Sequence, residues 1–295
     1  MNKIMDLFIK LGSINRKIIF ILVAISVFVP LLITTDQPIR VTSYTQAVFD
    51  TIENLPDKSK ILISFEYGPS TKPEIHPMSL ALVEHIFRRD HLIYATALWP
   101  DGNFMSTQTF NKIANKLNKK FGPDYVVYGQ DYVNLGYKPG AEAVIKGIAS
   151  DIATLYTKDL KDNILSGIPM MKGIKNISNF DLVISLSAGF PGTMEWVQFA
   201  CDPNNIPMVS GCTSVQVTEV LPFIDNGQVN GVLAGMPGAA EYEQLLRKQF
   251  SDMNNKSAMA LKGMPAQSTA HIVIVLAIIL GNITFFIQKN RKGSN

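Results

Sequence analysis

The sequence has 295 residues, a formal net charge of +3, four histidines and two cysteines. The 27 lysines and arginines are scattered apart from two groups beside apolar segments, so no concentrated basic face for nucleic acid is present. The histidines show no H-x-H or H-E-x-x-H spacing and the cysteines form no C-x-x-C pair. We therefore expect no nucleic-acid partner and no metal site, and no motif indicates a cofactor.

An apolar segment near the N-terminus predicts a membrane span over residues 18–35, preceded by a cytoplasmic segment of residues 1–17. The run from Ile18 to Ile33 contains no charged residue. With two threonines after it, the run is just long enough to cross about 30 Å of hydrocarbon. A cleaved signal peptide is the alternative, but no small-x-small cleavage site follows the run. The first 17 residues have apolar side chains at helical spacing, which favours an interfacial helix or an extension of the span.

The middle of the chain, residues 36–268 or roughly 230 residues, is predicted to form one α/β domain. Short runs that are almost entirely apolar are typical of strands buried on both faces. These runs are 61–65, 92–99, 125–128 and 182–186, with weaker ones at 207–210 and 229–233. Between them, apolar stripes at helical spacing lie over 78–87, 110–121, 144–155 and 239–250, and a further helix is expected over 43–54. The alternation predicts a Rossmann-like three-layer αβα domain with a mostly parallel sheet.

Two stretches of the domain depart from this alternation. Residues 157–180 are long for a connection in a compact α/β unit, which favours a small subdomain or a partner-binding flap. The segment from Gly129 to Gly140 mixes tyrosines and a lysine with glycines and a proline. Aromatic and amide groups on a mobile loop suit recognition of a ligand or partner.

A second membrane span is predicted over residues 269–288, followed by a cytoplasmic basic tail of residues 289–295. Asn282 interrupts its apolar face. An unpaired amide is unfavourable in hydrocarbon, so we expect Asn282 to pack against the first span or a neighbouring subunit. Lysine and arginine are concentrated before the first span and after the second. The positive-inside rule therefore predicts that both termini are cytoplasmic and the domain is extracytoplasmic.

The loops that follow parallel strands converge at one edge of a sheet and form the usual ligand crevice. We therefore expect one crevice lined by Glu66, Tyr67, Asp101, Asp131, Tyr132, Ser187, Thr193, Cys212 and Thr213. No loop matches a phosphate-binding motif, neither G-x-x-x-x-G-K-[ST] nor G-x-G-x-x-G. We expect Thr193 to cap the next helix, because Glu195 in its first turn would repel a phosphate.

Two kinds of catalysis remain possible at this edge. Cys212 would lie near a helix N-terminus that lowers its thiol pKa, with His76 as the base. An inert buried cysteine, or a disulfide with Cys201, is the alternative for this thiol. Three carboxylates follow successive predicted strands and could instead support acid–base chemistry or cap helices. They are Glu66, Asp101 and Asp131.

The leading interpretation is a membrane-anchored domain that binds a protein partner or a small ligand as a component of a membrane assembly, without catalysing a reaction. Its expected partners are the lipid bilayer and either another membrane protein or further copies of this chain. A membrane-bound hydrolase or transferase that uses Cys212 or the three carboxylates is the alternative. Catalysis would need a histidine or a close carboxylate pair in the crevice, whereas binding needs only the loops.

Overall fold

The computed structural model describes residues 15–33, 39–253 and 258–292. The chain divides into two compact units. One is an α/β unit, Ile39–Leu261, and the other is a helical unit that combines Met1–Pro38 with Lys262–Asn295. The α/β unit is close to the predicted domain but ends before residue 268.

A six-stranded sheet forms the centre of the α/β unit. Its strands are β1 (Lys60–Glu66), β2 (Leu92–Ala97), β3 (Tyr132–Tyr137), β4 (Leu182–Ser187), β5 (Met208–Cys212) and β6 (Gly231–Ala234). Their order is β3-β2-β1-β4-β5-β6, and every neighbouring pair is parallel. The strand order reverses between β1 and β4, as in Rossmann-like folds. The predicted α/β class and parallel sheet are confirmed.

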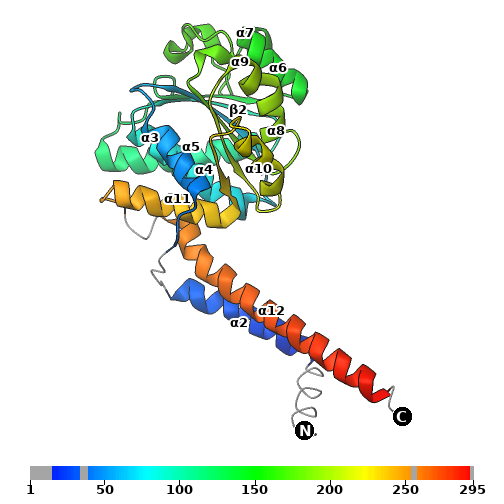
Figure 1. Cartoon of the computed structure of the whole chain (residues 1–295). Helices are drawn as coiled ribbons and strands as arrows, with labels where there is room; N and C mark the ends of the chain where they lie inside the picture. Colours follow the sequence, from blue (N-terminus) through cyan, green and yellow to red (C-terminus); the bar gives the residue numbers. More distant parts are fainter. Residues whose placement is uncertain (1–14, 34–38, 254–257, 293–295) are drawn as a thin grey trace. The chain divides into compact units, whose positions relative to one another are not determined.

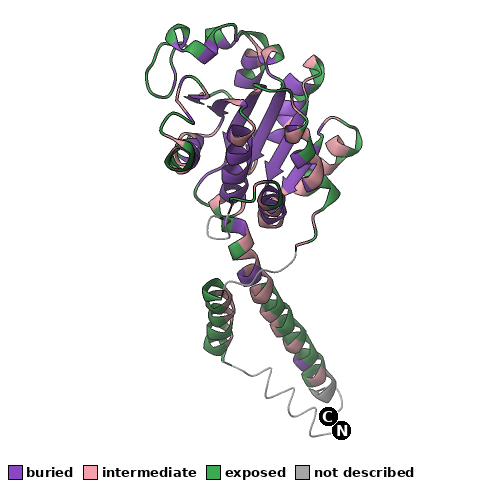
Figure 2. Ribbon diagram, turned by 90° about the vertical axis from the view of Figure 1, so that its left-hand side faces the viewer, coloured by how far each residue is buried: buried purple, intermediate pink, exposed green. Residues whose placement is uncertain are grey.

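Helices cover both faces of the sheet (Figure 1). On one face lie α3 (Ser43–Glu53), α4 (Lys72–Arg88), α5 (Gly102–Phe121) and α11 (Gly235–Gln249). On the other lie α6 (Glu142–Ser150), α7 (Ile152–Leu155), α8 (Thr193–Trp196), a π-helical turn (Val197–Cys201), α9 (Asp202–Asn204) and α10 (Val217–Asp225). The strands between the two layers are buried almost throughout, whereas the outer faces of the helices are exposed (Figure 2). This is why the strands are apolar on both sides.

The insertion between α7 and β4 contains no long helix or strand. It holds three 3-10 turns, Leu165–Gly167, Pro169–Met171 and Ile177–Asn179. Met170 and Met171 are buried in the core cluster on the α6 face. The predicted break in the α/β alternation is therefore present, and both methionines belong to the core.

The third strand lies later in the chain than the sequence predicts. The apolar run 125–128 is a turn region, and β3 starts at Tyr132 inside the segment expected to be a loop. An edge strand pairs on one side only, so it tolerates polar and glycine residues such as Asn134 and Gly136. The pattern used to find strands buried on both faces therefore selects the wrong segment here.

Close packing fixes the start of α5 against the end of β1. A Cβ atom on Gly102 would lie 2.2 Å from the Phe65 carbonyl oxygen and 2.6 Å from the Ala97 Cβ. We expect Gly102→Ala to lower the free energy of unfolding by about 1–3 kcal/mol, because the backbone must shift. Denaturant unfolding of the full chain in detergent measures this. Gly167→Ala is the control, since nothing lies within 4 Å of its added Cβ, and equal midpoints for both variants would contradict the close approach.

The helical unit contains α2 (Arg16–Leu32), and α12 (Met259–Lys292) runs into it from the α/β unit. Among the described residues, one helix is long and apolar enough to cross a membrane, over Met259–Lys289. The predicted second span lies inside it. The 17 residues of α2 extend about 26 Å, which is short of a typical hydrocarbon core. A second span is thus not shown, and the first 14 residues lie outside the described part.

A hydrogen bond connects α2 and α12 within the helical unit. Thr269 Oγ1 donates to the Ser26 carbonyl oxygen at 2.6 Å. Large apolar side chains of both helices are exposed, among them Phe20, Phe28 and Phe285. Asn282 is also exposed. It therefore does not pack against α2, which was one of the two contacts predicted for it.

Candidate functional site

The carboxyl edge of the sheet collects most of the residues that the sequence analysis selected. Seven of them lie there, namely Glu66, Tyr67, Asp101, Ser187, Thr193, Cys212 and Thr213. Glu66, Ser187 and Cys212 are register partners on adjacent strands, so their side chains point to the same face of the sheet. The loops after β1 and β2 also touch, because a Cβ on Gly68 would lie 2.6 Å from Asp101 Oδ2.

Asp131 and Tyr132 do not belong to this edge. They lie at the start of β3 and therefore at the amino edge of the sheet. The prediction that they join the crevice is wrong, because it took residues 125–128 as the strand and placed these two after it. Asp131 stabilises the turn before β3, where its Oδ2 accepts a hydrogen bond from the Val127 amide at 2.7 Å.

Glu66 is completely buried at the end of β1. Its Oε1 accepts hydrogen bonds from the Ser64 hydroxyl and, at 3.1 Å, from the Trp196 indole N–H. Its Oε2 accepts from Ser185 Oγ at 3.3 Å. Burial raises the pKa of Glu66 to about 8, although these three donors oppose the shift. Glu66 therefore anchors Trp196 beneath the edge and is not accessible to a substrate.

Buried hydroxyl groups extend this network across the sheet. Ser64 is the register partner of Thr96 on β2 and of Ser185 on β4, and Ser185 is the partner of Ser210 on β5. Thr193 Oγ1 lies 2.7 Å from Ser210 Oγ. The hydroxyl of Thr193 is thus used inside the domain. The predicted capping role is wrong for it, because the N-cap position belongs to the preceding residue, Gly192.

Cys212 lies in the same buried layer, and the structure gives it no reactive character. Burial raises the pKa of its thiol to about 12, and Glu74 and Glu219 add to the shift. His76 belongs to α4, which covers the other face of the sheet, so it is not placed to activate this thiol. Cys201 is also buried and both thiols are free, so the alternative of a disulfide between them is not realised.

We expect iodoacetamide to label neither thiol of the folded full chain. The reason is that both thiols are buried and the attacking species is the thiolate. The reaction time is chosen so that both thiols are fully labelled in denaturant. Intact mass spectrometry after quenching measures the number of adducts. Rapid labelling of Cys212 in the folded chain would instead show an accessible thiolate and restore the covalent alternative.

His76 and Tyr67 form a pair on the opposite face of the sheet. His76 Nδ1 lies 3.0 Å from the Tyr67 hydroxyl. Burial lowers the pKa of His76 to about 4, with further contributions from Lys72 and Lys112. The imidazole is therefore neutral near pH 7. It lines a wide, lysine- and amide-rich hollow of about 430 Å³ with both lysines.

At the carboxyl edge, carboxylates of the domain itself occupy backbone donors that a phosphate would use. The Gly192 amide donates to Glu195 Oε2 at 2.7 Å. The Ser214 amide and hydroxyl donate to Glu74 Oε2 at 2.9 and 3.0 Å. Gly235 has a positive φ of 57°, and a Cβ there would lie 2.0 Å from Ser214 Oγ. Internal anions and close packing thus fill these positions.

The same edge presents large apolar side chains to the outside. Phe190, after β4, is 62% exposed, and Val215, after β5, is 82% exposed. Phe104, in the first turn of α5, is 55% exposed. The indole N–H of Trp99 donates to the Phe190 carbonyl oxygen at 3.2 Å, which ties the loop after β2 to the loop after β4. We call Trp99, Phe104, Phe190 and Val215 the apolar edge.

The sequence analysis pointed to Glu195 as an anion that excludes phosphate, but it missed the apolar edge and the role of Glu74. It searched the loops for glycines, hydroxyls and acids, and treated apolar loop residues as neutral. The signal that was available is the position of Phe190 and Val215 directly after strand ends, where loops converge. Glu74 had no such signal, since an acid in the first turn of a helix is common.

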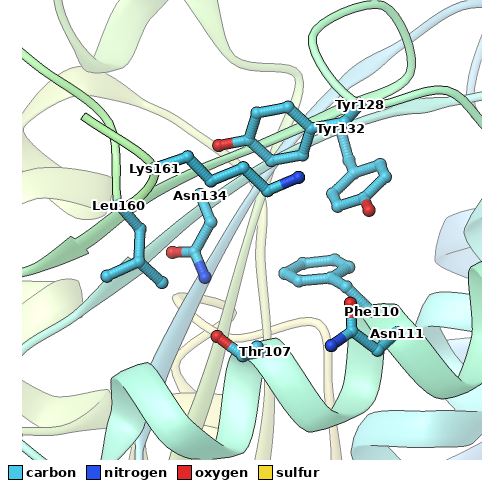
Figure 3. Close-up of a pocket in the computed structure, with 8 residues that line it drawn as sticks. All are labelled: Thr107, Phe110, Asn111, Tyr128, Tyr132, Asn134, Leu160 and Lys161. Atoms are coloured by element: carbon cyan, nitrogen blue, oxygen red, sulfur yellow. The ribbon is translucent and has the colours of Figure 1, made fainter. Parts of the chain in front are cut away.

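Tyr132 lines a separate cavity of about 200 Å³ between α5, β3 and the insertion (Figure 3). The ring of Phe110 stacks on Tyr132, with centroids 4.9 Å apart, and Tyr128 meets Tyr132 edge-on. Lys161, from the insertion, contributes the one charged side chain of the lining. Of the residues expected to line the crevice, Tyr132 lines this cavity, which lies away from the expected crevice.

Comparison with family models finds no match for this chain, and comparison with curated proteins finds none either. Among solved structures, the N-terminal domain of trehalose-6-phosphate phosphatase from Candida albicans is 12% identical, with a TM-score of 0.31 over 85% of this chain and 44% of that one. Trehalose-6-phosphate synthase OtsA is 13% identical, with a TM-score of 0.29 over 87% of this chain and 47% of that one. This chain spans less than half the length of either. At these TM-scores the likeness carries no argument about the site.

Proposed function

We propose that this chain is a membrane-anchored binding protein whose α/β domain holds a protein partner at the apolar edge. The observation that carries the proposal is the exposure of Phe190 and Val215, on the loops after β4 and β5, and of Phe104, in the first turn of α5, at one edge of the sheet. Large apolar side chains exposed at one edge of a folded domain are typical of an interaction site. Aromatic residues such as Phe190 and Trp99 are also typical anchors of protein interfaces.

The polar groups at this edge support a protein partner over a small ligand or substrate. A small-molecule site needs a few convergent polar groups that are free to bind. Here Glu66 is buried and accepts a hydrogen bond from Trp196, and Glu74 and Glu195 accept hydrogen bonds from backbone amides of the domain. The hydrolase or transferase alternative would need Cys212, or the carboxylates of Glu66, Asp101 and Asp131 acting together. Cys212 and Glu66 are completely buried and Asp131 lies at the opposite edge of the sheet, which leaves Asp101 as the one exposed member of this set.

Anchoring to a membrane is the second part of the proposal. The exposed apolar residues of α12 suit lipid, and a helix of 34 residues is longer than a bilayer core requires. We assign residues 18–35, near the N-terminus, to the other span, with both termini cytoplasmic and the domain outside. Lysine and arginine flanking the outer ends support this orientation. The exposed Asn282 then suits a contact with a neighbouring membrane helix.

Purification of the full chain in a mild detergent tests the partner. The wild-type chain should retain a stoichiometric protein partner, and the double variant Phe190→Ser/Val215→Ser should lose it. Ile164→Ser is the matched control, because Ile164 is equally exposed but lies in the insertion. Equal recovery of the same partner by the double variant and the wild type would overturn the proposal.

A further inference from the structure

The cavity between α5, β3 and the insertion is built from aromatic walls and a few polar groups (Figure 3). Phe110, Tyr128 and Tyr132 supply the rings, and Leu160 adds an aliphatic contact. Thr107, Asn111, Asn134 and Lys161 complete the lining. An apolar cavity of about 150 Å³ is enough to hold benzene. At about 200 Å³, this cavity fits one ring with a small substituent.

Lys161 lines this cavity, and its ammonium group forms no ion pair with a carboxylate of the described residues. Its Nζ lies 3.5 Å from the centroid of the Tyr128 ring, a cation–π contact that favours this position of the ammonium group. The nearby acid, Asp159, is already saturated. It accepts hydrogen bonds from the Tyr128 hydroxyl at 2.6 Å, from the Asn163 side chain at 2.9 Å, and from two backbone amides. Lys161 therefore offers an ammonium group to an anion.

Tyr132 supplies a second group for a ligand. The residue is 8% exposed, and its hydroxyl forms no hydrogen bond with a described residue, although solvent reaches the oxygen. Burial raises the pKa of this phenol, so it stays protonated and can donate a hydrogen bond. By contrast, the Asn134 side chain is satisfied, since it donates to Ser106 Oγ at 2.9 Å and accepts from the Gly136 amide at 3.0 Å. Asn134 forms a fixed wall.

We propose that this cavity binds a small aromatic carboxylate. Its ring would lie among Phe110, Tyr132 and Leu160, and its carboxylate would pair with Lys161. One lysine and no arginine in the lining suits a single negative charge, and a phosphoryl group would call for more donors. The site shares no residue with the apolar edge, although Thr107 follows Phe104 by one turn of α5. The inference is therefore independent of the proposed partner.

Ligand-observed ¹⁹F NMR of 4-fluorobenzoate with the full chain in lipid nanodiscs tests the site. The probe should show saturable binding. Lys161→Met should weaken this binding by at least about tenfold, because a charge-assisted hydrogen bond is lost. Tyr132→Phe, which removes the free hydroxyl alone, should weaken it severalfold. Lys158→Met should leave it unchanged, since Lys158 is exposed and pairs with Asp162.

Two neutral or cationic probes separate ring binding from charge recognition. 4-Fluorobenzyl alcohol and 4-fluorobenzylamine have similar rings but no carboxylate, so both should bind at least about tenfold more weakly. Lys161 is exposed, so its substitution should not affect folding, and far-UV circular dichroism checks this. Unsaturable association of 4-fluorobenzoate, or equal binding by wild type and Lys161→Met, would overturn the proposal. Neither outcome depends on the apolar edge.

Discussion

Replacing Glu66 by alanine is expected to lower the free energy of unfolding by about 3 kcal/mol or more at pH 6. The change removes a buried side chain and leaves the Trp196 indole N–H and the hydroxyls of Ser64 and Ser185 without their acceptor. A buried unsatisfied polar group costs about 1–3 kcal/mol, and the cavity adds to this. Glu66→Gln should be tolerated, because the amide has the same shape and its oxygen still accepts from Trp196.

The wild-type chain and Glu66→Gln should also differ in how their free energy of unfolding depends on pH. The pKa of Glu66 rises from 4.5 to about 8 on folding, so the folded chain holds a proton that the unfolded chain releases. The stability from this proton is complete below pH 4.5 and is lost as the pH rises toward 8, by up to about 1.4 kcal/mol per pH unit. Glu66→Gln should lack this decline, and should therefore be the more stable protein at pH 8.

Denaturant unfolding of the full chain in detergent measures both effects. Tryptophan fluorescence follows the α/β unit specifically, because both tryptophans, Trp99 and Trp196, lie in it. Gly167→Ala serves as the reference, because no atom of the structure lies within 4 Å of the added Cβ. If Glu66→Gln were as unstable as Glu66→Ala, or kept the wild-type decline between pH 5 and 8, the carboxyl would not be neutral in the folded chain.

The apolar edge should dominate the affinity for the partner. We expect Phe190→Ser and Val215→Ser each to weaken the partner's affinity by about tenfold or more, since central apolar anchors contribute at least 1–2 kcal/mol. Neither side chain is buried, so the stability of the domain should change little. Titration of the purified partner against each variant in nanodiscs gives the dissociation constants. Unchanged constants for both variants would exclude these residues from the interface.

The sequence predicts most of the sheet because buried parallel strands leave a strong signal. Five of the six strands overlap the apolar runs, and α4, α5, α6 and α11 overlap the predicted apolar stripes. No apolar stripe was predicted for the helices between β4 and β6, including α10. The exception is β3, where Asn134 and Gly136 interrupt the pattern and the turn at 125–128 imitates it. The edge position of β3 lets it tolerate these polar and glycine residues, and a sequence does not show which strand will lie at an edge.

The site was harder to predict than the fold because it depends on what covers each side chain. Glu66 at a strand end resembles a catalytic acid in the sequence, and only the packing of Trp196 over it shows a buried anchor. Cys212 resembles a nucleophile until its burial is known. The exposure of Phe190 and Val215 likewise depends on loop geometry, which apolar periodicity does not encode.

Site-specific photo-crosslinking in native membranes tests the central claim most directly. A photoreactive phenylalanine analogue placed at position 190 of the full chain should give one discrete protein adduct. The same analogue at position 215 should give the same adduct, and at position 164, in the insertion, it should give none. An adduct from position 164 without one from 190 or 215 would contradict partner binding at the apolar edge, as would the absence of any adduct from both edge positions.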